Sequence, residues 1–150
     1  RLKLVHRGYM GHLNPMDFGN FDQELSPDAK RFELGAFNAA GMAGAEKATE
    51  LLLECGIDSI FRHVRKLIGQ FEWGLEEMPF ETMYQFEENE HSSICMFSHT
   101  DHSRNESIFQ SLSESGVNIS LRGGGLRLAP HYYNSPDEVD QILSLLWENV

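Results

Sequence analysis

Three consecutive glycines, Gly123 to Gly125, separate two strand-like segments near the end of this chain. Residues 117–122 and 126–129 are the short, apolar runs that β-strands favour. Because glycine adopts the left-handed backbone that a tight turn needs, the triplet predicts an antiparallel hairpin. Arg122 and Arg127 flank the glycines, so the hairpin is either an ordinary turn with two solvated arginines or a binding site for a carboxylate or phosphate.

The helix that follows this hairpin has the clearest boundaries in the sequence. Ser135 is placed to cap it, Pro136 suits its first position, and Glu138 completes a capping box. Apolar residues then recur at helical spacing, which predicts a buried stripe of Val139, Ile142, Leu143 and Leu146.

The earlier segments show either the helical spacing of apolar residues, about 3.6 residues, or the spacing of about two that strands have. A helix is expected from Asn38, as its cap, to Cys55, with Gly56 as a left-handed stop and a face of small residues suited to close packing. A second helix is expected to be capped by Asp58 and to bury a stripe of Phe61, Val64, Leu67, Ile68 and Phe71. A strand over residues 93–98 and a helix over 105–115, stopped by Gly116, follow.

This order of elements predicts an α+β fold, a two-layer sandwich in which helices pack on one face of a small, mainly antiparallel sheet. Residues 1–34 are weakly patterned and rich in glycine and proline, so we expect a lead-in segment there. Residues 35–150 are expected to form the domain itself.

Charge and composition exclude several classes of function. The chain of 150 residues has 12 basic and 23 acidic side chains and a net charge of −11, which disfavours nucleic-acid binding. No apolar run approaches the roughly 20 residues of a membrane span. Cys55 and Cys95 both lie in apolar runs and cannot form a disulfide framework, which indicates a cytoplasmic protein. The glutamate-rich span between Lys66 and Arg104 is interpreted as a solvated face.

The histidines at 91, 99 and 102, with Asp101, invite a metal interpretation. Their spacing offers no helix placement and no usable third ligand, so a polar loop after a strand is the better interpretation and no metal is expected.

Two segments resemble class V, pyridoxal-phosphate-dependent aminotransferases, a group that includes cysteine desulfurases and isopenicillin N epimerase-like proteins. The first is Arg122-Gly123 together with the block from Leu126 to Asp140. The second, Arg31 to Gly41, is similar to the family's RFE-G-T-P-N segment. The resemblance implies the small C-terminal domain of a fold-type-I enzyme.

The resemblance also implies roles for individual residues. Arg127 would hold the α-carboxylate of an amino-acid substrate, and a guanidinium fork suits that task. Arg122 and His131 would support the surrounding loops. Ala36 and Asn38 lie in the family's phosphate-proximal segment, but Ala36 replaces the threonine whose hydroxyl reaches the cofactor, and Asn38 is interpreted mainly as a helix cap.

Two further departures from the family's pattern limit the reactions expected of this chain. Gly123 to Gly125 stand where desulfurases keep a loop with a nucleophilic cysteine, so a protein-persulfide mechanism is not expected. The Schiff-base lysine lies N-terminal to this region in the family, and the contexts of the chain's four lysines, Lys3, Lys30, Lys47 and Lys66, do not match it.

The sequence therefore predicts a C-terminal fragment of a pyridoxal-phosphate enzyme that supplies the substrate arginine and a lid over the cleft. Arg1 is not an initiator methionine, which favours a fragment, and the fragment alone is expected to be inactive. Its expected partners are the large cofactor-binding domain, an amino-acid substrate and a second copy, through apolar surface near Ala40, Gly44 and Ala48. The alternative is a non-catalytic binding or interaction domain that keeps the small-domain fold.

Overall fold

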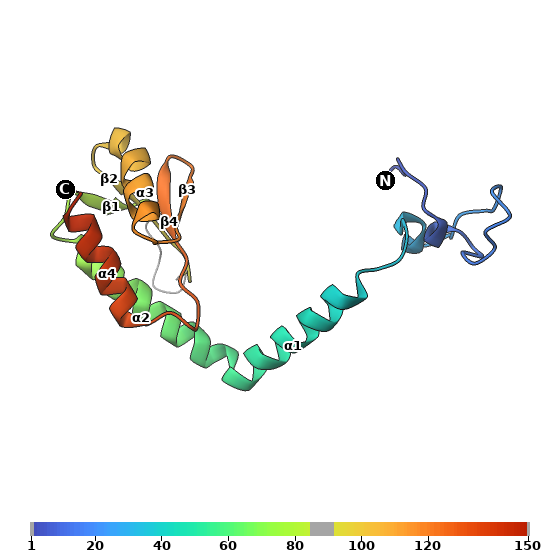
Figure 1. Cartoon of the computed structure of the whole chain (residues 1–150), viewed down its shortest axis with the longest axis horizontal. Coiled ribbons are helices and arrows are strands. Elements are labelled where there is room, and N and C mark those ends of the chain that lie inside the picture. The colour runs from blue at the N-terminus through green and yellow to red at the C-terminus, as the bar shows by residue number, and fades with distance from the viewer. Residues whose placement is uncertain (1, 85–91, 150) are drawn as a thin grey trace. The chain divides into compact units, whose positions relative to one another are not determined.

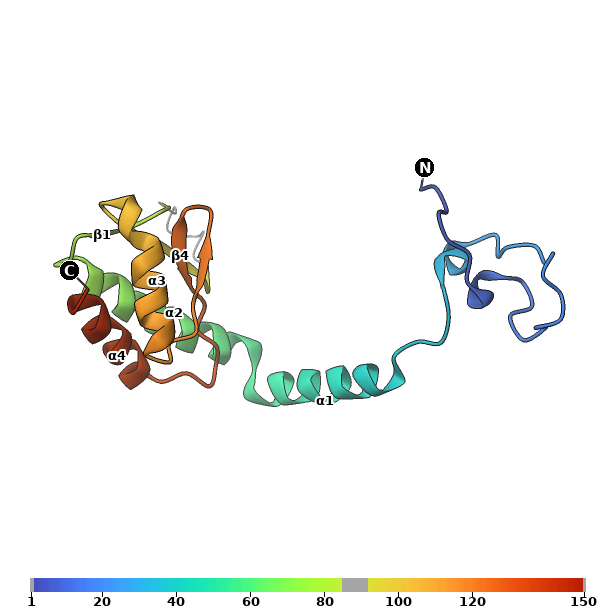
Figure 2. The same ribbon diagram turned by 45° about the horizontal axis from the view of Figure 1, so that its top comes forward.

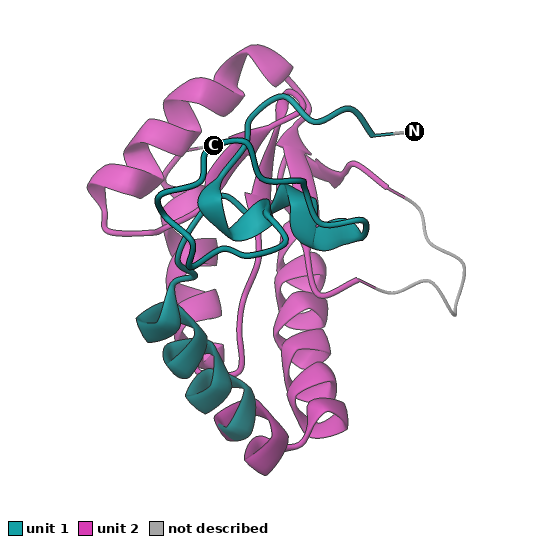
Figure 3. Cartoon of the chain, turned by 90° about the vertical axis from the view of Figure 1, so that its right-hand side faces the viewer, with its two compact units in different colours: residues 1–50 teal, residues 51–150 magenta. Residues whose placement is uncertain are grey.

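The computed structural model describes residues 2–84 and 92–149, and the chain divides into two compact units, Arg1–Glu50 and Leu51–Val150 (Figure 3). Each unit is described by itself. The division between the units falls inside a helix. The domain boundary between residues 34 and 35, which the sequence suggests, stays a prediction.

The first unit is mostly irregular chain with little core. It contains two short 3-10 helices, η1 (Tyr9–Gly11) and η2 (Ala29–Phe32), and an antiparallel bridge between His12 and Leu25. The Asp28 carboxylate caps η2 by accepting a hydrogen bond from the Lys30 backbone N–H at 2.9 Å.

Helix α1 (Ala39–Cys55) begins in the first unit and ends in the second. The Asn38 side chain accepts a hydrogen bond from the Gly41 N–H at 2.9 Å, as a helix cap does. Gly56 has a φ of 81°, which confirms the predicted left-handed stop. None of the residues of α1 is buried, so its small-residue face is open to solvent in this chain.

The second unit contains a four-stranded antiparallel sheet with the order β1-β2-β4-β3. The strands are β1 (Phe80–Thr82), β2 (Cys95–His99), β3 (Ser120–Arg122) and β4 (Gly125–Leu128). Three helices accompany them: α2 (Ile57–Leu75), α3 (Asn105–Glu114), which follows the 3-10 turn η3 (His102–Arg104), and α4 (Pro136–Trp147) (Figure 1).

A single apolar core joins these helices to one face of the sheet. Its largest fully buried side chains include Phe71 from α2, Phe97 from β2, Leu126 from β4 and Leu146 from α4. The rings of Phe71 and Phe97 meet edge to face with centroids 4.9 Å apart. This arrangement confirms the predicted α+β sandwich with helices on one face of an antiparallel sheet.

The structure corrects three details of the sequence-based prediction. Gly56, not Asp58, occupies the position before α2, and Asp58 lies in the first helical turn. Phe61 was predicted to be buried but is 47% exposed. Strand β1 was not predicted, because its residues Glu81 and Thr82 face solvent and merge with the acidic span.

The hairpin between β3 and β4 turns over two residues. Arg122 pairs with Gly125, which leaves Gly123 and Gly124 as the loop, with φ values of 57° and 83°. Two left-handed residues in succession form the turn whose twist matches that of the strands. The third glycine therefore belongs to β4. Within residues 2–84 and 92–149, each helix is too short or too polar to cross a bilayer.

Candidate functional site

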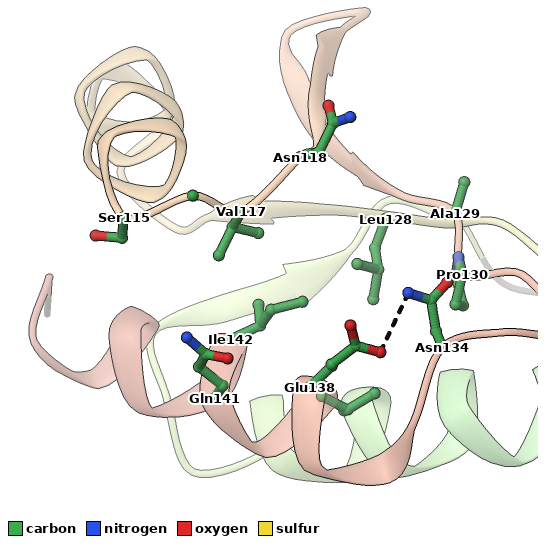
Figure 4. Close-up of a pocket in the computed structure, with 12 residues that line it drawn as sticks. Ser115, Val117, Asn118, Leu128, Ala129, Pro130, Asn134, Glu138, Gln141 and Ile142 are labelled. Carbon is green, nitrogen blue, oxygen red and sulfur yellow. Dashed lines mark hydrogen bonds between the residues drawn. The ribbon is translucent and has the colours of Figure 1, made fainter.

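Arg127 lies on an interior strand of the sheet, between Met96 of β2 and Ser120 of β3, its two cross-strand partners. Its neighbours Leu126 and Leu128 are buried in the core. Because side chains alternate along a strand, Arg127 belongs to the opposite face, away from the helices. In Figure 4 Leu128 points toward α4 and Ala129 points the other way, as alternation along a strand requires.

The guanidinium of Arg127 is incompletely satisfied. Its Nε is buried and has no hydrogen-bond partner among the described residues. An unpaired buried donor costs about 1–3 kcal/mol, and more when it is charged. The planar fork of arginine matches a carboxylate with two parallel N–H···O bonds. The site therefore has an unused donor that an anionic ligand can satisfy.

Arg122 lies on the same face as Arg127, two residue pairs nearer the turn. It pairs with Gly125, while Arg127 pairs with Ser120, so the two arginines are diagonal neighbours across the hairpin. Arg122 is exposed, whereas Arg127 is partly buried. The structure thus brings both predicted arginines to one face.

Two methionines that the sequence analysis did not single out lie on this face. Met83 donates its backbone N–H to the Met96 carbonyl at 2.9 Å, which extends the pairing of β1 and β2 by one residue. A side chain at Gly125 would meet the Met83 sulfur and the Phe97 carbonyl, so Gly125 is kept small by close packing. The alternation of Met96 with the buried Cys95 and Phe97 is the signal that could have placed it there.

The turn of the hairpin is held by Asn105, another residue whose role the sequence analysis did not identify. Asn105 is 2% exposed and lies at the start of α3. Its amide group donates to the Gly124 carbonyl at 2.7 Å and to the Ser98 hydroxyl at 2.9 Å. Its amide oxygen accepts from the His99 backbone N–H at 3.0 Å. These bonds fix the glycine turn to the end of β2.

The histidines at the end of β2 and in the polar loop after it make hydrogen bonds within the protein. His99 Nδ1 accepts the Asp101 backbone N–H at 2.8 Å, and its Nε2 lies 3.2 Å from Arg104. His102 Nδ1 lies 2.8 Å from the Ser98 hydroxyl. Hydrogen bonds from Ser103 hold the pKa of Asp101 below its usual range. His91, which the metal interpretation also invoked, lies outside the described residues.

His131 packs within the loop between β4 and α4. Its ring stacks on Tyr133 with centroids 5.0 Å apart and meets Tyr132 edge to face at 4.7 Å. Its backbone N–H donates to the Asn134 side chain at 2.8 Å. These contacts hold the loop and leave the ring exposed.

The predicted capping box of α4 is confirmed. Glu138 accepts the Ser135 backbone N–H at 2.7 Å, and the Ser135 hydroxyl accepts the Glu138 N–H at 3.3 Å. The Ser135 N–H and the Asn134 amide hold the pKa of Glu138 below its usual 4.5. A pocket of about 250 Å³ lies beside this cap (Figure 4). Arg127 does not line it, so the pocket and the arginine are separate features.

Ala36 and Asn38 lie in the first unit and are exposed. The Asn38 amide oxygen is already used by the Gly41 N–H, and Ala36 has no hydroxyl. The amide NH2 of Asn38 is therefore the one side-chain hydrogen-bond donor at these two positions.

Comparison with known proteins identifies a family to which this chain is similar. The family model described as Aminotransferase class-V matches residues 10–140. No curated protein matches the chain.

Solved structures share the fold at low sequence identity. The apo cysteine desulfurase of Thermococcus onnurineus NA1 is 20% identical, with a TM-score of 0.74 over 84% of this chain and 34% of that one. The cysteine desulfurase CsdA of Escherichia coli is 21% identical, with a TM-score of 0.74 over 97% and 38%. The aminotransferase TlmJ of Streptoalloteichus hindustanus is 16% identical, with a TM-score of 0.57 over 81% and 41%. The chain thus spans about a third of the length of the desulfurases.

Proposed function

Because the chain belongs to the class V aminotransferase family, we propose that it is the small-domain part of a pyridoxal-phosphate enzyme acting on an amino acid. Arg127 binds the substrate α-carboxylate in this proposal. The observation that carries it is the buried Arg127 Nε without a partner among the described residues, on the face of the sheet opposite the core. When bound, the cofactor supplies an electron sink for transamination, elimination or racemisation.

The chain's own residues position the substrate. Arg127 fixes the carboxylate, and a bidentate pair also restricts rotation of the substrate about that anchor. Met83 and Met96 add apolar side chains to the same face, and an apolar surrounding strengthens an ion pair. Arg122 and His131 support the hairpin and the loop after it, and the domain as a whole acts as a lid.

The first-unit segment lacks, at Ala36, the hydroxyl with which the family contacts the cofactor phosphate. Asn38 uses its amide oxygen to cap α1, which leaves only its amide NH2 as a donor for a phosphate. The Schiff-base lysine in this proposal lies outside residues 1–150, and Lys47, for example, is ion-paired with Glu50 on an exposed helix. A large cofactor-binding domain, a homodimeric assembly and a cytoplasmic location complete the proposal, with residues 35–150 as the small domain.

A protein-persulfide mechanism is not part of this proposal. Only Gly123 and Gly124 form the turn where a cysteine loop would stand. Cys95 is fully buried in β2, and Cys55 ends α1.

Borohydride trapping of pyridoxal phosphate tests the proposal. We expect the 150-residue chain to show no stoichiometric adduct by mass spectrometry, and the full-length protein to show one on a lysine outside this chain. In the full-length protein Arg127→Ala is expected to weaken amino-acid binding about 10- to 100-fold, the effect of losing a charged hydrogen-bond pair. A stoichiometric adduct on Lys3, Lys30, Lys47 or Lys66 would contradict the assignment.

A further inference from the structure

Helices α2 and α4 lie side by side and run in the same direction (Figures 1 and 2). Near their beginnings His63 Nε2 contacts the Asn134 carbonyl at 2.9 Å. Further along, the Gln70 side chain donates to Asp140 at 2.5 Å. Near their ends Gly74 lies against the Leu143 side chain, whose methyl groups would have to move for a side chain at position 74. The two carboxyl ends therefore meet at one end of the unit.

A pocket of about 230 Å³ is formed at this junction by Trp73, Gly74, Glu76, Glu77 and Trp147. Trp73 is 74% exposed and Trp147 is 51% exposed, although tryptophan is among the most apolar of side chains. The pocket is smaller than the roughly 300–1,000 Å³ of small-molecule sites. Its size suits one inserted side chain.

The electrostatics of the pocket favour a cation. The carboxyl end of a helix carries a partial negative charge, and neither α2 nor α4 has a basic residue in its last turn. Glu76 and Glu77 add two carboxylates that form no ion pair within the described residues. Arg104 reaches the Asn149 carbonyl just beyond α4, but it does not line the pocket. Two indole faces beside two carboxylates form a setting for a cation–π contact.

We propose that this pocket docks a lysine or arginine side chain from a basic segment of a partner protein. The indoles of Trp73 and Trp147 contact the aliphatic stem and the cationic group, and Glu76 and Glu77 neutralise its charge. A basic segment is the favoured occupant because the pocket itself is negative, with Glu76, Glu77 and two helix carboxyl ends around it. The site lies at the helix ends, so this inference does not rest on the proposed enzymatic function.

Tryptophan fluorescence reports directly on this pocket, because Trp73 and Trp147 are the only two tryptophans of the chain. The probe is a capped peptide of alternating glycine and arginine, and its glutamate counterpart is the control peptide. With the full 150-residue chain we expect a saturable fluorescence change with the arginine peptide, weakened by salt, and none with the glutamate peptide.

Two double variants that remove the same charge separate docking in the pocket from non-specific attraction of the basic peptide to the negatively charged chain. Glu76→Gln with Glu77→Gln is expected to weaken peptide binding about tenfold. Glu46→Gln with Glu54→Gln changes the net charge equally on the exposed helix α1 and is expected to leave binding within about twofold. Circular dichroism checks that both variants keep the fold.

Three outcomes would overturn the proposal. The first is an absent or non-saturable signal with the wild-type chain. The second is an equal loss of affinity in both charge variants, which would indicate general attraction. The third is the same fluorescence change when the chain is concentrated without peptide, together with a doubling of its mass by light scattering. That result would make a second copy the occupant.

Discussion

Met96 and Arg127 stand directly opposite each other on the neighbouring antiparallel strands β2 and β4. Side chains in such a pair lie roughly 4.5–5.5 Å apart at their Cβ atoms, close enough to interact. A carboxylate at position 96 would therefore supply Arg127 with a partner from within the protein.

Met96→Glu is expected to weaken amino-acid binding by the full-length protein about 10- to 100-fold, because the new carboxylate competes for the guanidinium. Met96→Gln has a similar size without the charge and is the control, with a much smaller expected loss. Binding constants for both variants, with circular dichroism of each, make the comparison. Equal losses in the two variants would indicate that packing, not competition for Arg127, causes the effect.

The two glycines of the hairpin turn are expected to tolerate substitution unequally. Gly124 has a φ of 83°, and Gly124→Val forces a β-branched residue into the left-handed region, at a cost of about 1–2 kcal/mol in the free energy of unfolding. Gly123→Asn is expected to be nearly neutral, because asparagine followed by glycine suits this turn.

Urea unfolding measures both changes, and Gly69→Ala serves as the reference glycine substitution. Gly69 lies inside α2 with open space around it, so alanine there is expected to stabilise the chain by about 0.5–1 kcal/mol. A Gly124→Val variant as stable as the wild type would show that the turn is not fixed as described.

The capping box of α4 predicts a pH dependence. The pKa of Glu138 is lowered in the folded chain by the Ser135 N–H and the Asn134 amide. The folded carboxylate is thus favoured, so its stabilisation is fully present above the unfolded pKa of 4.5 and is lost as the pH falls through the lowered folded value. Glu138→Gln should remove this part of the acid destabilisation.

Urea midpoints at neutral pH and below pH 4.5 test this linkage. Asp137→Asn removes a charge from the same helical turn and is the control. A Glu138→Gln variant that loses as much stability on acidification as the wild type would contradict the role of the capping box.

The two cysteines are expected to differ sharply in reactivity. Burial raises the pKa of the Cys95 thiol to about 11, whereas Cys55 is exposed at the end of α1. The thiolate is the reactive form, so a thiol reagent at neutral pH should modify one cysteine in the folded chain and both after unfolding. Cys55→Ser should abolish the fast reaction. Rapid modification of Cys95 in the folded Cys55→Ser chain would contradict its burial in β2.

The features that sequence analysis predicted best are local ones. The capping box at Ser135 and the stop at Gly56 depend on a few consecutive residues and their backbone preferences. Strand β1 was missed because an edge strand with an exposed Glu81 carries no alternating signal that separates it from a loop.

Features that depend on pairing between distant segments could not be predicted. The surroundings of the Arg127 Nε depend on strands β2 and β3 pairing on either side of β4, which places Met96 and Ser120 opposite Arg127. The role of Asn105 depends on α3 starting beside the hairpin turn. The exposure of Phe61 reflects where the core ends along α2, which its helical period does not reveal.

The central claim is that Arg127 recognises the carboxylate of an amino acid. The measurement that tests it most directly is the binding of a panel of L-amino acids, each compared with its own amide, to the full-length protein loaded with pyridoxal phosphate. With the wild type we expect at least one amino acid to bind about 10- to 100-fold more tightly than its amide. Arg127→Gln should abolish that preference and Arg122→Gln should keep it. A preference that survives in Arg127→Gln would contradict the account.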